Sequence, residues 1–312
     1  MSVLFVFPGQ GSQTPGMLHQ LPQHAACHAT LAEAEAALGR SPLLLDTTAA
    51  LQSTVAVQLC LLIAGVASAR LLQAEDIQPH MVAGLSIGAF PAAVIAGVLD
   101  FHHAVQLVQL RGQLMEQAYP QGYGMCAITG LALPQLQNLL DKTQAAGQQV
   151  YLANINAEQQ LVVAGSDAGL QAISQVALQA GAARCQRLAI SVPSHCCLLD
   201  QAAQTLAQTM RDTPLHAPAC LYLSANAARV LRSAEQIRDD LPNNMAREVH
   251  WHDTARLAWE RGARLAVEML PGTTLSRLLK PVFSQGVVMT VADDRLDSLQ
   301  YTTRRMAQDD QY

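Results

Sequence analysis

A chain of 312 residues that is 50% hydrophobic and 14% charged can bury a large core, which excludes a disordered protein. Its formal net charge of -5 leaves no basic tract of the kind that binds phosphate backbones, so we expect no nucleic-acid partner. The seven cysteines are scattered and odd in number, which favours reduced thiols over a disulfide framework.

The predicted elements alternate between strand and helix from the start of the chain. Val3–Phe7 is a predicted strand, followed by the polar, glycine-rich loop PGQGSQTPGM. Helical periodicity covers about 25–38 and again about 54–72. A strand ends near Met81–Ala83, and Asp100 is a candidate N-cap for a helix that runs to about residue 118. This alternation predicts a mainly parallel sheet covered by helices on both faces.

The segment 123–189 has an element order of its own. Its sequence predicts a strand, a helix, two strands, a second helix and a last strand, and this βαββαβ order is that of a ferredoxin-like unit. After it the larger fold resumes, with CLYLSAN and RLAVEML as strands and TLSRLLKPVF as a helix. We therefore expect a large α/β domain formed by 1–122 and 190–312, with a small domain inserted at 123–189.

Three further features limit where the protein acts and what it binds. The longest apolar run, Val55–Ala69, is interrupted by Gln58 and is shorter than a bilayer span, which favours a buried core helix. The start MSVLFVFPGQG has no positive region typical of a secretion signal. Histidines cluster in HAACH, at His102 with His103 and in HWH, without a second cluster at zinc spacing. We expect a soluble cytoplasmic protein without a metal.

The stretch MVAGLSIGAF at 81–90 holds the first candidate for chemistry. Ser86 stands between Gly84 and Gly88, after a short buried strand and before an alanine-rich helix that tolerates Pro91 in its first turn. Strand, sharp bend and helix form the context of a G-x-S-x-G nucleophile elbow, although an ordinary glycine-rich turn would give the same pattern. Ser86 is therefore a candidate nucleophile.

A serine nucleophile needs a base, and His195 is the best placed of the ten histidines. It follows ISVPS, a strand end closed by Pro193, whereas His19 and His216 fall on exposed polar faces. Arg111 shares a helical face with Leu107 and Leu114, where an unpaired guanidinium is costly. It either meets a carboxylate such as Glu116, reaches solvent, or receives an anionic ligand.

Five motifs make the sequence resemble one family over nearly its whole length. They are the Ser86 elbow together with FPGQGSQ (7–13), RGQLM (111–115), NAEQQLVVAG (156–165) and SVPSH (191–195). Their order and spacing are similar to those of the malonyl-CoA:acyl carrier protein transacylases. This resemblance implies an α/β-hydrolase-like core with an inserted ferredoxin-like domain and an active site in the cleft between them.

The resemblance also implies a role for each site residue. Ser86 would be the nucleophile, His195 its base, and Gln10 with the main-chain N–H of Ile87 the oxyanion hole. Arg111 would bind the malonyl carboxylate. The histidine would be oriented by the main-chain carbonyl of Asn244, where the family usually has Gln. Malonyl-CoA would be the substrate and an acyl carrier protein the partner, with no permanently bound cofactor.

The elbow departs from the family pattern G-H-S-x-G-E. Leu85 replaces the histidine, and Ala89 with Phe90 replaces the acidic-aromatic pair. GLSIGAF resembles more closely the transacylase (epsilon) subunit of malonate decarboxylase, which implies the carrier subunit of that enzyme as acceptor and its other subunits as partners. A fatty-acid-synthesis transacylase, a serine esterase and a non-catalytic scaffold subunit are the alternatives.

Overall fold

The computed structural model describes residues 2–119 and 121–309, and a six-stranded sheet forms the centre of its larger part. The strands are β1 (Ser2–Phe7), β2 (Met81–Gly84), β7 (Leu221–Ser224), β8 (Arg229–Leu231), β9 (Ala263–Glu268) and β10 (Val287–Thr290). Their order is β10-β9-β1-β2-β7-β8, and all neighbours are parallel except β7 with β8. The predicted mainly parallel sheet is confirmed.

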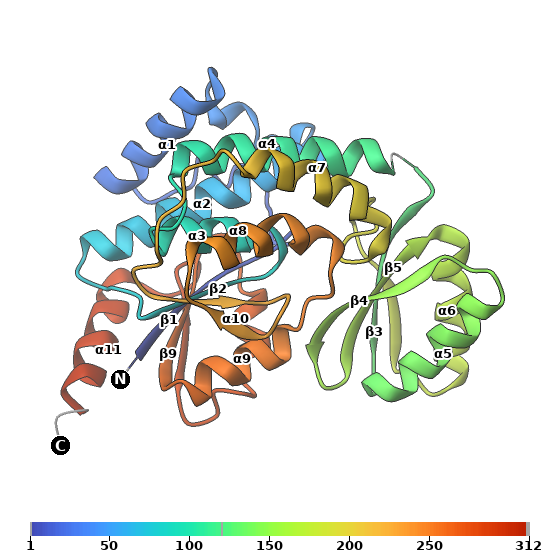
Figure 1. Cartoon of the computed structure of the whole chain (residues 1–312). Coiled ribbons are helices and arrows are strands. Elements are labelled where there is room, and N and C mark those ends of the chain that lie inside the picture. Colours follow the sequence, from blue (N-terminus) through green and yellow to red (C-terminus); the bar gives the residue numbers. More distant parts are fainter. Residues whose placement is uncertain (1, 120, 310–312) are drawn as a thin grey trace.

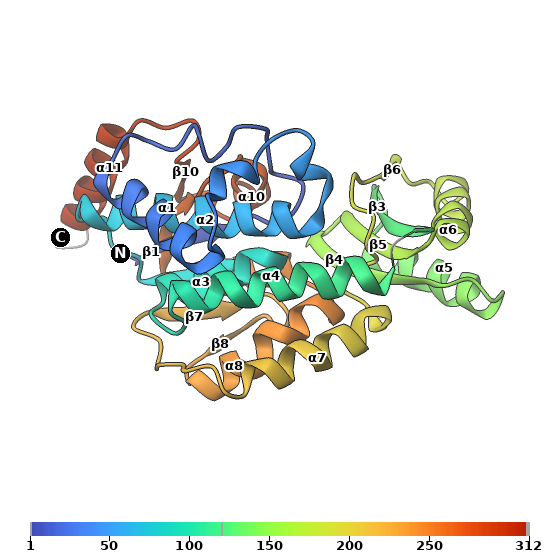
Figure 2. The ribbon, with the colours of Figure 1, turned by 90° about the horizontal axis from the view of Figure 1, so that it is seen from above.

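Helices cover both faces of this sheet (Figures 1 and 2). They are α1 (Ala25–Leu38), α2 (Thr54–Ala74), α3 (Ala89–Ile95), α4 (Phe101–Ala118), α7 (Asp200–Met210), α8 (Ala234–Asn243), α9 (Trp251–Glu260), α10 (Thr274–Leu279) and α11 (Leu296–Asp309). Each face of the sheet packs against its helices in a separate apolar core. Strand β1 contributes side chains to both cores, because alternate residues of a strand point to opposite faces. Phe5 and Phe7 pack in the core that contains α2, α3 and α4, while Leu4 and Val6 pack against α9 and α10.

The apolar run Val55–Ala69 lies in α2, as the core helix that the sequence predicts. Among the described residues α2 alone is long and apolar enough to cross a membrane, but 89% of its most apolar window is buried inside the protein. Gly112 of α4 lets the two helices approach closely, because a Cβ there would lie 2.7 Å from the Cα of Val55. This close approach brings Arg111 on α4 beside Gln58 on α2.

A second, four-stranded sheet forms the small domain beside the large one (Figure 1). Its elements are β3 (Tyr123–Thr129), α5 (Leu133–Ala145), β4 (Val150–Ala157), β5 (Gln160–Ser166), α6 (Asp167–Gln179) and β6 (Arg184–Arg187). The strand order β4-β5-β3-β6 is antiparallel throughout, which is the ferredoxin-like arrangement. The predicted fold class is confirmed, and the assignment of 123–189 as a separate domain stays a prediction.

The two faces of the small sheet have different partners. Cys126 and Ile128 of β3 pack in a core with α5 and α6, whereas Met125 and Ala127, which alternate with them, line a cavity toward the large domain. The strand alternation therefore gives the small domain one face for its own core and one face for a site.

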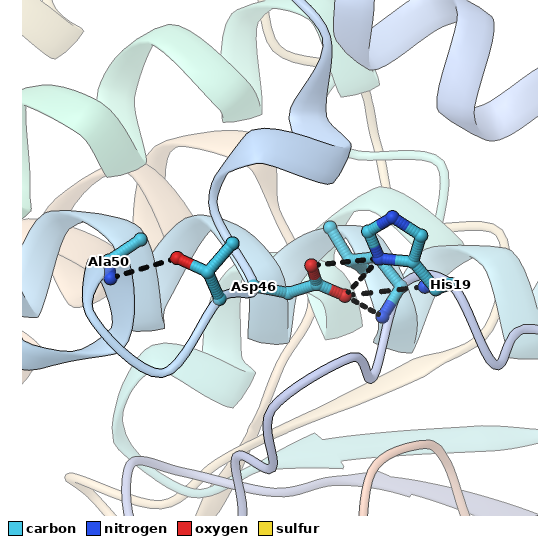
Figure 3. Close-up of polar contacts among 5 residues, drawn as sticks. His19, Asp46 and Ala50 are labelled. Carbon is cyan, nitrogen blue, oxygen red and sulfur yellow. Dashed lines mark hydrogen bonds and ion pairs between the residues drawn. The ribbon is translucent and has the colours of Figure 1, made fainter.

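One buried carboxylate fixes the glycine-rich loop that follows β1 (Figure 3). Asp46, whose side chain is 1% exposed, accepts the N–H of Leu18 at 2.8 Å and that of His19 at 3.3 Å. Its Oδ1 also lies 2.9 Å from Nδ1 of His19, so this histidine, unremarkable in the sequence, has a structural partner. The segment that follows Gln10 is thereby tied to the loop that leads into α2.

Candidate active site

Ser86 lies in the tight bend between β2 and α3. Its φ of 56° is in the left-handed region, which a non-glycine residue adopts only under constraint. Glycine is required on both sides, because a Cβ on Gly84 would lie 2.0 Å from the carbonyl carbon of Gly88 and one on Gly88 would lie 2.1 Å from the carbonyl oxygen of Phe7. The G-x-S-x-G pattern thus forms an elbow and not an ordinary turn.

His195 lies within hydrogen-bond distance of this serine. Its Nε2 is 2.8 Å from Oγ of Ser86, and its Nδ1 is 2.7 Å from the main-chain oxygen of Asn244. A carbonyl can only accept, so Nδ1 carries the proton and Nε2 is left to accept the serine hydroxyl. The backbone of His195 is also left-handed, with φ 68°, and its N–H donates to the carbonyl of Met245 at 2.7 Å.

The surroundings keep this imidazole neutral. Burial and, after it, the positive charge of Arg111 lower the pKa of His195 to about 4, against a smaller opposing effect of the hydrogen bonds with the backbone at Asn244 and Arg247. At neutral pH the ring is therefore in the form that can take a proton. The group that accepts from its Nδ1 is a main-chain carbonyl and not a carboxylate.

Arg111 is fully buried in the same site, with one strong contact and spare donors. Its Nη1 donates to Oε1 of Gln58 at 2.6 Å, while Nη2 has only long contacts, 3.4 Å to Oδ1 of Asn244 and 3.5 Å to Oγ of Ser86. Nε has no hydrogen-bond partner among the described residues. Burial lowers the pKa of Arg111 to about 9, so the guanidinium stays charged at neutral pH.

These groups surround a cavity of about 250 Å³ between the large domain and the inner face of the small sheet. Gln10 from the loop after β1 and Ile87 from the elbow line it together with Ser86, His195 and Arg111. The structure thus brings to one place the residues that the sequence proposed, Asn244 included through its carbonyl. Arg111 lines the cavity with a charged guanidinium whose Nε has no partner among the described residues and whose Nη2 has only long contacts, so the cavity is complementary to an anion.

Three polar residues of this site were not among the candidates that the sequence offered. Gln58 was visible only as the interruption of the apolar run in α2, and the structure shows that it binds Arg111. Asn154 and Asn156 line the cavity from β4, and their Oδ1 atoms have no partner among the described residues. Their spacing of two on one strand was the available signal, since it puts both side chains on one face.

Two details of the sequence interpretation need correction. Glu116, considered there as a structural partner for Arg111, instead accepts hydrogen bonds from Oγ of Ser53 and the N–H of Val55 at the start of α2. Asp100 does occupy the N-cap position of α4, but its side chain makes no capping hydrogen bond. Arg111 therefore has only neutral partners, and its charge is available to a ligand.

A larger groove of about 740 Å³ lies beside the cavity, and His195 lines both. It contains His195, Cys196 and Arg247 but not Ser86, Gln10 or Arg111, so the candidate residues come together in the smaller cavity. Within residues 2–119 and 121–309, no group of three or more His, Cys, Asp or Glu side chains could hold a metal ion.

Comparison with known proteins gives a consistent result. Residues 4–298 match the family described as "Acyl transferase domain". The chain is 35% identical over 295 residues to a malonyl CoA-acyl carrier protein transacylase of Haemophilus influenzae, covering 92% of this chain and 94% of that one.

Two solved structures extend the comparison to the fold. The structure of an acyl carrier protein S-malonyltransferase from Vibrio cholerae superposes with a TM-score of 0.90 at 35% identity, covering 96% of this chain and all of that one. A malonyl-transacylase solved in complex with a type II PKS acyl-carrier protein gives 0.87 at 34% identity, covering 94% and 96%.

Proposed function

The chain belongs to the acyl transferase domain family and, within it, to the malonyl CoA-acyl carrier protein transacylases, and we propose that it carries malonyl groups from malonyl-CoA to a carrier thiol through an ester on Ser86. The chain is thus an acyltransferase. The observation that carries the proposed mechanism is the set of contacts in which His195 joins Ser86 to the carbonyl of Asn244.

In the first half-reaction, Nε2 of His195 takes the hydroxyl proton while Oγ of Ser86 attacks the thioester carbonyl carbon. The C–S bond then breaks, and the same proton passes to the sulfur of CoA as the malonyl-serine ester forms. The second half reverses these steps: the carrier thiol gives its proton to His195, its sulfur attacks the ester, and Ser86 recovers its hydroxyl. Malonyl-CoA enters as substrate, CoA leaves as product, and the reaction needs no permanently bound cofactor.

The remaining residues would stabilise charge at the two ends of the acyl group. Gln10 and the main-chain N–H of Ile87 are proposed as donors to the oxyanion of the tetrahedral intermediates. Arg111 would bind the malonyl carboxylate through Nε and Nη2, the edge of the guanidinium that Gln58 leaves open. Asn154 and Asn156 offer acceptors to N–H groups of the substrate.

The carboxylate-binding arginine separates this function from a serine esterase. An esterase would share the elbow and the base, but it would have no use for a buried cation with unpaired donors in the acyl cavity. The distinguishing measurement is the ratio of thiol transfer to hydrolysis for malonyl-CoA. Hydrolysis that outpaces transfer, at a saturating concentration of carrier, would support the esterase.

The first candidate for the acceptor is an acyl carrier protein, as in the relative that was solved with one. The carrier subunit of a malonate decarboxylase is a second candidate, and it would bring the other subunits of that enzyme as partners. The residues that favour it are Leu85, Ala89 and Phe90 around the elbow. Values of kcat/KM for the two carriers decide between them. A preference for the decarboxylase carrier selects the second candidate, and equal values or the opposite preference select the first.

The covalent intermediate tests the mechanism directly. Malonyl-CoA without a carrier should add one malonyl group, located on Ser86 by intact-protein mass and peptide mapping. Ser86→Ala should abolish the adduct, whereas the matched change at an exposed serine of α11, Ser298→Ala, should leave it intact. Undiminished labelling of the Ser86→Ala protein would refute the nucleophile.

A location in the cytoplasm is part of the proposal. The seven free cysteines and the burial of α2 inside the fold support it. Fractionation of cells that express the tagged chain tests it, and recovery in the membrane pellet would contradict it.

A further inference from the structure

A carboxylate outside all five sequence motifs is connected to the site by hydrogen bonds. Asp240 lies on α8 and borders the groove of about 740 Å³, not the cavity of about 250 Å³ that contains Ser86 and Arg111. Its Oδ1 accepts a hydrogen bond from Oγ of Ser224 at 2.6 Å and another from Nδ2 of Asn226 at 3.1 Å. Asn226 also donates to the main-chain oxygen of Asp240 at 3.2 Å, so this asparagine is held on α8 by two contacts.

The chain of contacts continues from Asn226 to the substrate-binding arginine. Oδ1 of Asn226 accepts from Nδ2 of Asn244 at 3.1 Å, and Oδ1 of Asn244 faces Nη2 of Arg111 at 3.4 Å. Three side chains therefore join α8 to α4: Asp240, Asn226 and Asn244. We call these three residues the relay.

The two ends of the relay fix the direction of every amide in it. An ionised carboxylate can only accept hydrogen bonds, and a guanidinium can only donate them. Asn226 must therefore turn its NH₂ toward Asp240 and its oxygen toward Asn244, which in turn must present its own oxygen to Arg111. If either amide were reversed, two donors or two acceptors would face each other in a partly buried site.

We propose that the relay positions Arg111 for the carboxylate of the acyl group, and that Asp240 is therefore a positioning residue for substrate selectivity; this inference rests on the proposed malonyl transfer. With Asn244 on one side and Gln58 on the other, the guanidinium is held between two neighbours, and its Nε, which has no partner among the described residues, stays free to donate to the ligand. Without the relay, Asn244 can turn its amide and Arg111 loses one of its two fixed neighbours.

The state of Asp240 fits this role. Burial raises its pKa to about 6, against hydrogen bonds from Ser224 and Asn226 that lower it, so the carboxylate is ionised and acceptor-only at neutral pH. Holding a charge there is costly for the fold, and the contacts with Ser224 and Asn226 offset part of that cost.

The relay reaches Asn244 through its side chain, whereas His195 uses the main-chain oxygen of the same residue. Breaking the relay should therefore weaken binding of the malonyl carboxylate more than it slows acyl transfer. Acetyl-CoA lacks the carboxylate, so the ratio of malonyl to acetyl transfer isolates the effect.

The test measures kcat/KM of the full-length protein for malonyl-CoA and acetyl-CoA with one carrier thiol. Asp240→Ala and Asn226→Ala should each lower the malonyl-to-acetyl ratio about threefold to tenfold, mainly through a higher KM for malonyl-CoA. Asp240→Asn should restore most of the ratio, because its amide oxygen can still accept from Asn226. Since both single changes break one relay, the double variant should lose no more than either alone.

Asp239→Ala, a change at the exposed neighbour on the same helix, is the matched control and should keep the wild-type ratio. A folded Asp240→Ala or Asn226→Ala protein with an unchanged ratio, or with equal losses for both substrates, would overturn the relay. The same holds for fully additive losses in the double variant. A wild-type protein that forms no malonyl-serine ester would instead refute the proposed function, so the two failures are distinguishable.

Discussion

The 250 Å³ cavity has a reacting end, formed by Ser86 and His195, and a charged end, formed by Arg111. The side chains at these two ends are held in different ways. At the reacting end, Ser86 and His195 both have left-handed backbones, and short contacts of 2.8 and 2.7 Å connect serine, histidine and the carbonyl of Asn244. At the charged end, Arg111 has one short hydrogen bond of 2.6 Å, two contacts of 3.4 and 3.5 Å, and an Nε without a partner among the described residues.

This difference fits the role proposed for each end. Groups that move a proton must be aligned before substrate arrives, because alignment during the reaction would add to the barrier. A group that binds a substrate carboxylate must instead keep donors free for it, and a fully satisfied arginine would have none to offer. Changes at the reacting end should therefore affect every acyl group, and changes at the charged end only malonyl.

The largest effect is expected at the reacting end. His195→Ala removes the base and should lower transfer of malonyl and of acetyl alike, by about 10²- to 10⁴-fold in kcat/KM. The same change at an exposed histidine, His216→Ala, serves as the control and should have no effect. A loss confined to malonyl would contradict the division between the two ends.

Arg111→Ala tests the charged end. It should lower kcat/KM for malonyl-CoA by about 10²- to 10⁴-fold, since two charge-assisted hydrogen bonds are lost, while acetyl transfer holds steady or rises. Arg111→Lys should recover malonyl transfer only in part, because an ammonium lacks the planar fork. Arg305→Ala on the exposed face of α11 is the control. Equal losses for both substrates, or a protein that unfolds, would make Arg111 a structural residue.

Asn244 contacts both ends, His195 through its main-chain oxygen and Arg111 through its side chain, so Asn244→Ala tests the two contacts separately. The main-chain oxygen that orients His195 remains, so acetyl transfer should stay within about tenfold of wild type. The side chain that faces Arg111 is lost, so the malonyl-to-acetyl ratio should fall about threefold to tenfold. Steady-state kinetics with both substrates measures this, and an acetyl loss as deep as that of His195→Ala would show that the side chain orients the base.

The smallest predicted effect is a displaced pH profile. The pKa of His195 is lowered to about 4, so the base stays unprotonated as pH falls through 6.5, where an ordinary histidine would gain its proton. Acylation by acetyl-CoA, which carries no titrating carboxyl, should stay flat from pH 8 to about pH 5 and decline below that. An inflection near 6.5 would contradict the lowered pKa.

The same shift has a consequence for stability. Because the fold favours the neutral ring of His195, the lowered pKa adds to the free energy of unfolding in full above pH 6.5, and this addition is lost as pH falls toward 4. The difference in Tm between the wild type and His195→Ala should therefore change across that window and remain constant above it.

Much of the fold was predictable because its signals are local. The buried strand at 81–84, the two glycines of the elbow, the apolar run of α2 and the βαββαβ order each depend on residues close together in the chain. The sequence interpretation left β8, β10 and the helices α7, α8, α9 and α11 unassigned. Their amphipathic or short segments become clear only from what they pack against.

The sequence by itself determined the elbow that holds Ser86, because the serine carries a backbone signal in Gly84 and Gly88. The strand end predicted at ISVPS before His195 does not form, since β6 ends at Arg187 and an irregular segment leads to the histidine. Only the tertiary structure decided how Arg111 is held. Gln58 of α2 accepts from it directly, whereas Asn226 in the β7–β8 turn and Asp240 on α8 are connected to it through Asn244. Hydrogen bonds between residues distant in the chain leave no periodicity or spacing to read.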